Sequence, residues 1–128
     1  VFGPQRNILK VVDRFMDFFI EESCGYCTPC RVGNVLLKER LDRIIEGKGE
    51  PFDLDYLKDL GETVKIASRC GLGQTSPNPV LTSIQNFRSA YETHLKDGVD
   101  GLRPSFDIGA ALADAESIAG RKSSYMEA

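Results

Sequence analysis

Apolar residues recur at helical spacing along most of the chain, and no stretch shows the strict alternation typical of a strand. The first helical segment covers about residues 7–23 and is so rich in apolar positions that we expect it to be buried on most sides. Its apolar positions are Ile8, Leu9, Val11, Val12, Phe15, Met16, Phe18, Phe19 and Ile20. A second helix is predicted to begin with Thr28 as its N-cap and Pro29 in its first turn, and to stop at residues 47–49, Gly-Lys-Gly.

Two further helices follow in the first part of the chain. Asp53 is predicted to cap the third, and Ser76 and Pro77 to open a fourth that continues as far as Leu95. The connections are short, and short connections favour antiparallel neighbours. The sequence therefore predicts an all-α fold, a four-helix bundle with a Cys-rich loop and a short C-terminal helical extension.

The pattern changes after residue 97. Residues 97–101, Asp-Gly-Val-Asp-Gly, are typical of a linker, and residues 106–119 have the spacing of one short amphipathic helix. We therefore divide the chain into a helical domain, residues 1–97, and a linker with a C-terminal extension, residues 98–128. Since the sequence begins with Val1 and enters a helical pattern at once, we expect it to be part of a longer polypeptide.

Charge and hydropathy narrow the classes of partner. The net charge of −3 provides no general attraction to nucleic acid or to an anionic membrane surface, so we expect no nucleic-acid partner. No apolar run approaches the roughly 18 residues of a membrane span, so no direct membrane span is expected.

The four cysteines have an asymmetric spacing. Cys24, Cys27 and Cys30 lie in one tight run, and Cys70 follows after a gap of 39 residues. Two disulfides would leave an awkward, strained thiol in the tight run, and disulfide scaffolds are usually loop-rich and secreted, so we favour one metal centre. A helix that rises roughly 27 Å and an antiparallel return would bring Cys70 back to the level of Cys30.

The local backbone also suits a negatively charged centre. Cys30 falls in the first turn of a helix, where the free amides and the helix dipole favour negative charge. Gly25, and the glycines of Gly-Leu-Gly after Cys70, are expected to let amides approach the sulfurs, the latter by ending the third helix in a left-handed conformation. Spacing favours an iron–sulfur cluster over zinc, which usually takes two separate pairs of cysteines, but leaves zinc open.

Two segments carry a specific resemblance. Residues 22–33, Glu-Ser-Cys-Gly-Tyr-Cys-Thr-Pro-Cys-Arg-Val-Gly, and residues 68–80, Ser-Arg-Cys-Gly-Leu-Gly-Gln-Thr-Ser-Pro-Asn-Pro-Val, are similar to the C-terminal iron–sulfur domain of NADH dehydrogenase flavoprotein subunits. This family includes the NADH-binding subunit of complex I and the matching subunits of NAD-reducing hydrogenases (the diaphorase subunit) and NAD-dependent formate dehydrogenases. The resemblance covers about residues 2–95.

The resemblance implies a cofactor, its ligands and a role. It implies one 4Fe–4S cluster held by Cys24, Cys27, Cys30 and Cys70, and an electron relay from FMN to the clusters of a partner, a ferredoxin-like iron–sulfur subunit. FMN and NAD(H) would bind only in the full-length subunit, so we assign no catalytic residue here. Because such clusters need a reducing compartment, we expect a cytoplasmic location, with membrane association only through a complex. The alternative function is a structural zinc-binding helical docking module.

Overall fold

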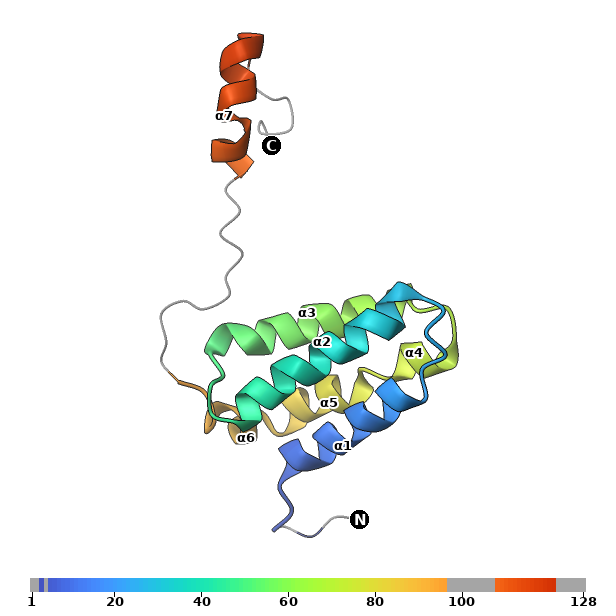
Figure 1. Ribbon diagram of the computed structural model, residues 1–128. Coiled ribbons are helices and arrows are strands. Elements are labelled where there is room, and N and C mark those ends of the chain that lie inside the picture. Colours follow the sequence, from blue (N-terminus) through green and yellow to red (C-terminus); the bar gives the residue numbers. More distant parts are fainter. Residues whose placement is uncertain (1–2, 4, 97–107, 122–128) are drawn as a thin grey trace. The chain divides into compact units, whose positions relative to one another are not determined.

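The computed structural model describes residues 3, 5–96 and 108–121, and all of its named elements are helices (Figure 1). Contacts between residues divide the chain into two units, residues 1–98 and residues 99–128. The helices of the first unit are α1 (Ile8–Glu21), α2 (Thr28–Ile45), α3 (Pro51–Ala67), α4 (Gly71–Thr75), α5 (Asn78–Asn86) and α6 (Arg88–Glu92), and the second unit contains α7 (Ile108–Ala119).

Four helices of the first unit enclose one apolar core. Helix α1 packs on α2, α2 on α3, α3 on α5, and α5 again on α1 (Figure 1). The short helix α4 lies against α3, and α6 lies against α5 and α1. The predictions of an all-α fold and of a four-helix bundle are therefore confirmed. The fully buried core side chains are Leu9, Val12, Met16, Leu37, Leu41, Ile44, Leu54, Leu57, Val64, Val80, Ile84 and Tyr91.

Two predicted helix starts are slightly wrong. Thr28 is already helical and Cys27 occupies the N-cap of α2. Helix α3 begins at Pro51 rather than after Asp53, whose carboxylate accepts a hydrogen bond from the backbone N–H of Glu50 at 2.8 Å, as in a capping box. Asp53 therefore does cap α3, as the sequence indicated, but from the third position inside the helix and not from the residue before it. The same carboxylate is 1% exposed and forms an ion pair with Arg40 at 2.6 Å.

The predicted fourth helix is broken at Phe87. This residue has φ −132° and ψ 37°, which ends α5 and begins α6. In a continuous helix, Ser83 and Tyr91 would be separated by about 12 Å along the axis. The break instead brings the two hydroxyl groups within 2.5 Å while Tyr91 is completely buried. Satisfying the buried tyrosine hydroxyl explains the interruption.

The expectation that the first helix is buried on most sides is wrong. Only Leu9, Val12 and Met16 of α1 are fully buried, whereas Phe15 is 45% and Phe18 is 52% exposed. A helix in a bundle of this kind contacts its neighbours through one face, which leaves an apolar stripe of α1 on the surface.

Helices α2 and α3 approach closely at a glycine. A Cβ added to Gly33 would overlap the Cγ2 methyl group of Val64. Gly61 plays the same part between α3 and α5, where an added Cβ would lie 2.9 Å from Leu81 Cδ2. Both contacts lie inside the bundle and help to set the spacing of the helices that lead to the cysteines.

In the second unit, α7 ends at Ala119 and is followed by Gly120 with φ +64°, a left-handed conformation that suits glycine. The predicted linker over residues 97–101, and the first two residues of the predicted helix over 106–119, lie outside the described residues. None of the described helices is long and apolar enough to span a membrane.

Candidate metal centre

The loop between α1 and α2 carries Cys24 and Cys27 and is closed by local hydrogen bonds. Gly25 has φ +72°, a conformation that a residue with a side chain adopts with difficulty. Its N–H donates to Ser23 Oγ at 3.3 Å, and its carbonyl accepts a hydrogen bond from Arg31 Nη1 at 3.1 Å. The loop is thus folded back on the first turn of α2.

Cys30 is the most buried of the four cysteines and is surrounded by hydrogen-bonding groups. It is 5% exposed and lies in the first turn of α2. Its sulfur lies 3.3 Å from Ser23 Oγ and 3.5 Å from Asn34 Nδ2. The side-chain oxygen of Asn34, Oδ1, accepts a hydrogen bond from Ser76 Oγ at 2.7 Å. Neither Asn34 nor Ser76 is exposed to solvent. A buried chain of polar groups therefore ends at the Cys30 sulfur.

The sequence suggested that Cys70 lies at the end of the third helix, and this is wrong. Helix α3 ends at Ala67, and Cys70 is the N-cap of α4. The expected left-handed glycines are also wrong: within the described chain only Gly25, Gly47 and Gly120 have positive φ, because Gly71 and Gly73 begin a new helix instead.

Gly73 allows the Cys70 segment to approach Cys30. A Cβ added to Gly73 would lie 2.6 Å from Ser68 Oγ and 3.1 Å from Cys30 Cβ. Ser68 is 4% exposed, and its hydroxyl has no hydrogen-bond partner in the described part of the chain. An unpaired buried hydroxyl beside a cysteine is a donor available to a bound group.

Cys27 connects the two cysteine motifs. The backbone N–H of Arg69 is the main influence that lowers the pKa of the Cys27 thiol below its usual value; burial opposes this, and the N–H of Cys30 reinforces it. Arg69 is the residue before Cys70, so the contact brings Cys27 beside the distant motif.

Exposed side chains also connect the loop over residues 24–30 to the segment before Cys70. Arg69 Nη1 donates to the hydroxyl of Tyr26 at 3.2 Å, and its guanidinium lies 5.4 Å from the centre of the tyrosine ring. Arg31 and Arg69, which flank two cysteines in the sequence, therefore hold the loop backbone and Tyr26 respectively.

All four cysteines are free thiols, and Cys24 and Cys70 are exposed. Among the described residues, no three His, Cys, Asp or Glu side chains converge as one metal ion requires. Four thiolates on a single zinc would each lie about 2.3 Å from the ion. In a cubane cluster each cysteine binds a different iron, so the sulfurs stand farther apart. The free thiols, the amide and hydroxyl donors and the glycine approach fit such a cluster.

Sequence reasoning missed several of these groups. Asn34 lies four residues after Cys30 and so on the same helical face, which is a signal that could have been read. Ser68 lies two residues before Cys70, but nothing in the sequence indicates that its hydroxyl is buried without a partner.

Comparison with known proteins identifies the family. Residues 10–94 match the model of the NADH-ubiquinone oxidoreductase-F iron–sulfur binding region. The chain belongs to this family. The family is an iron–sulfur binding region, so this chain carries an iron–sulfur cluster as its cofactor. The role of such a region is electron transfer.

Individual relatives agree with the family. The chain is 44% identical over 116 residues to the NAD-reducing hydrogenase HoxS subunit alpha of Cupriavidus necator, covering 91% of this chain and 19% of the relative. It is 50% identical over 90 residues to the NADP-reducing hydrogenase subunit HndC of Solidesulfovibrio fructosivorans, covering 70% and 18%. It is 40% identical over 94 residues to an NADH-quinone oxidoreductase subunit of Streptomyces coelicolor, covering 73% and 21%.

A solved structure shows the same fold. The crystal structure of an NAD+-reducing [NiFe]-hydrogenase in the H2-reduced state matches 98% of this chain and 21% of the matched chain, with 37% identity and a TM-score of 0.72. The chain thus spans about a fifth of the length of these relatives. Their names describe subunits, so members of this iron–sulfur family work within multi-subunit assemblies.

Proposed function

We propose that Cys24, Cys27, Cys30 and Cys70 hold one 4Fe–4S cluster, and that residues 1–97 form the domain that carries it. In this proposal the domain relays electrons between FMN, bound by a separate NADH-binding domain, and iron–sulfur clusters of a partner subunit of the ferredoxin-like kind. When bound, the cluster accepts and returns one electron at a time with little change in geometry.

The observation that carries the proposal is the contact between the two cysteine motifs. Arg69, next to Cys70, donates from Nη1 to the Tyr26 hydroxyl at 3.2 Å, and a Cβ added to Gly73 would lie 3.1 Å from Cys30 Cβ, so the two motifs meet in space. The Arg69 N–H also lowers the pKa of the Cys27 thiol. A lowered pKa favours the thiolate, the form in which cysteine binds iron.

The surrounding residues are suited to a negatively charged centre. Asn34 and Ser23 can donate hydrogen bonds to the Cys30 sulfur, and the free Ser68 hydroxyl is available to another sulfur. Donors to sulfur stabilise the more negative, reduced state. The burial of Cys30 excludes water from one side, whereas the exposure of Cys24 and Cys70 leaves another side close to the surface for electron exchange.

The names of the relatives support the choice of reaction partners. They describe NAD-reducing and NADP-reducing hydrogenase subunits and NADH-quinone oxidoreductase subunits. The hydride chemistry belongs, in our proposal, to a domain other than this one. Free thiolates and iron–sulfur clusters persist in reducing compartments, so we place the protein in the cytoplasm.

The proposal is tested in the intact assembly, purified without oxygen. NADH is added, the sample is frozen, and the EPR signal of this cluster is compared between the unchanged protein and Cys70→Ser. We expect the signal in the first and its loss in the second, with flavin reduction by NADH retained as the internal control. A variant that keeps the full low-temperature spectrum would exclude Cys70 as a ligand.

A further inference from the structure

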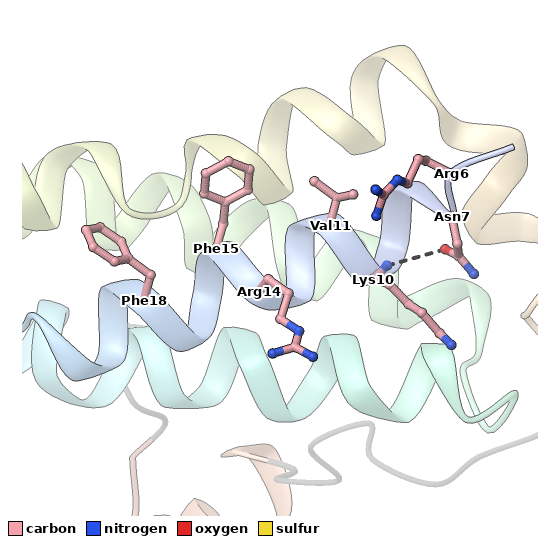
Figure 2. A pocket seen from close by; sticks show the side chains of 7 residues that line it. All are labelled: Arg6, Asn7, Lys10, Val11, Arg14, Phe15 and Phe18. Atoms are coloured by element: carbon pink, nitrogen blue, oxygen red, sulfur yellow. Dashed lines mark hydrogen bonds between the residues drawn. The ribbon is translucent and has the colours of Figure 1, made fainter. Parts of the chain in front are cut away.

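Helix α1 carries two stripes of side chains on its exposed surface. Val11, Phe15 and Phe18 form an apolar stripe, and Lys10 and Arg14, four residues apart, form a basic stripe on another side of the helix (Figure 2). Arg6, in the turn that precedes α1, lies beside Val11 (Figure 2). Together with Asn7 they line a hollow of about 680 Å³, to which no carboxylate contributes. We call these seven residues the α1 groove.

The α1 groove combines exposed aromatic side chains with basic side chains that form no ion pair in the described part of the chain. Phe15 and Phe18 are about half exposed, and buried aromatic side chains contribute strongly to protein interfaces. In the described part of the chain the side chains of Arg6, Lys10 and Arg14 make no ion pair, whereas Asp13 on another side of α1 is paired with Lys38 at 2.6 Å. The basic charge is therefore concentrated and available.

We propose that the α1 groove is the docking site for an acidic amphipathic segment of another protein subunit in the same assembly. Carboxylates of that segment would pair with Arg6, Lys10 and Arg14, while its apolar side chains would fill the space above Val11, Phe15 and Phe18. Aromatic residues and arginine at the centre, with charges at the rim, are the usual composition of such a contact.

Charge complementarity favours a separate protein over two other occupants. The net charge of −3 gives the chain no general attraction to an anionic membrane. A second copy of this chain would bring the same basic stripe to the contact, and like charges oppose each other there. Unpaired charge also accelerates the encounter of separate molecules, an advantage that a segment of the same polypeptide does not need.

The first test places a photo-crosslinking amino acid at position 15 in the intact assembly. Irradiation is followed by mass spectrometry of the crosslinked peptides. Lys58 on α3, which is exposed, lies outside the groove and is 12 residues before Cys70, is the control position. We expect position 15, but not position 58, to crosslink to a carboxylate-bearing segment of a different subunit. Crosslinks confined to the same polypeptide, to a second copy or to lipid, or no crosslink at all, would overturn the proposal.

The second test reverses the charge of the stripe. The double variant Lys10→Glu with Arg14→Glu should weaken binding of the neighbouring subunit about tenfold or more. Lys58→Glu on the exposed face of α3 is the control and should leave binding unchanged. It is compared with Lys10→Glu alone, so that each variant reverses one charge. Iron content and the EPR signal are measured in every variant and should not change, so a failure of docking is separable from a failure of cluster binding. Equal weakening by Lys58→Glu and Lys10→Glu would contradict the proposal.

Discussion

The side-chain amide of Asn34 lies 3.5 Å from the sulfur of Cys30, in the interior of the bundle. Its orientation is determined by Ser76, whose hydroxyl donates to the Asn34 carbonyl oxygen at 2.7 Å and so leaves the NH2 group directed at sulfur. Ser76 follows α4, and Asn34 belongs to α2, so the contact connects the Cys70 side of the site to the Cys30 side.

Replacing Asn34 by Leu should lower the reduction potential of the cluster. The substitution removes a hydrogen bond to a sulfur that carries more negative charge in the reduced state, so reduction becomes less favourable. We expect a shift of about −30 mV, which is roughly a threefold change in the one-electron equilibrium. The measurement is a redox titration followed by EPR.

Asn86→Leu is the matched control for this potential. Asn86 is an exposed asparagine on α5 whose Nδ2 donates to the Thr82 carbonyl at 2.7 Å, away from any cysteine. Its substitution should leave the potential unchanged. A potential that does not move in Asn34→Leu, or moves equally in both variants, would show that the amide does not influence the cluster.

Gly33→Ala should destabilise the bundle. The new methyl group would overlap Val64 Cγ2, where α2 and α3 are in contact. Overpacking of this kind costs about 1–3 kcal/mol, which outweighs the roughly 1 kcal/mol by which Ala is preferred over Gly in a helix. The free energy of unfolding, measured with urea on the cluster-free protein, reports the change.

Two further variants test that explanation. Gly3→Ala places a methyl group where nothing lies within 4 Å and should be neutral. Adding Val64→Ala to Gly33→Ala should cost less than Val64→Ala costs alone, since it removes the overlap. Strict additivity of the two substitutions would contradict the assigned contact.

Cys27 should react with an alkylating reagent at lower pH in the folded, cluster-free protein than in the urea-unfolded protein. The Arg69 N–H lowers the pKa of Cys27, so in the folded state the thiolate persists as pH falls below the usual thiol range. Peptide-resolved mass spectrometry gives the pH midpoint of modification. Arg69→Ala keeps the backbone N–H and should retain most of the difference between the two pH midpoints. Identical midpoints in folded and unfolded protein would show that the Arg69 N–H does not lower the pKa of Cys27.

Much of the fold could be predicted because the bundle is built from local signals. Helical periodicity identifies the main helices, and Gly47 with φ +69° ends α2 close to where the sequence indicates. The helical hairpin between Cys30 and Cys70 followed from helix length alone, and α2 and α3 do lie side by side (Figure 1).

Tertiary contacts explain what the sequence did not reveal. The break at Phe87 depends on the contact of Tyr91 with Ser83, and periodicity continues through that break. The exposed face of α1 could not be recognised because an apolar residue at helical spacing has the same pattern whether it faces a core or a partner. The roles of Asn34 and Ser76 depend on a contact between residues 42 positions apart.

The central claim is that these cysteines hold a 4Fe–4S cluster, and the most direct test is the iron and acid-labile sulfide content of the anaerobically purified full-length protein, with EPR after dithionite reduction. We expect about four iron and four sulfide per chain from this site and a rhombic signal that Cys70→Ser removes. One zinc per chain, with no sulfide and no signal assigned to these cysteines, would contradict it.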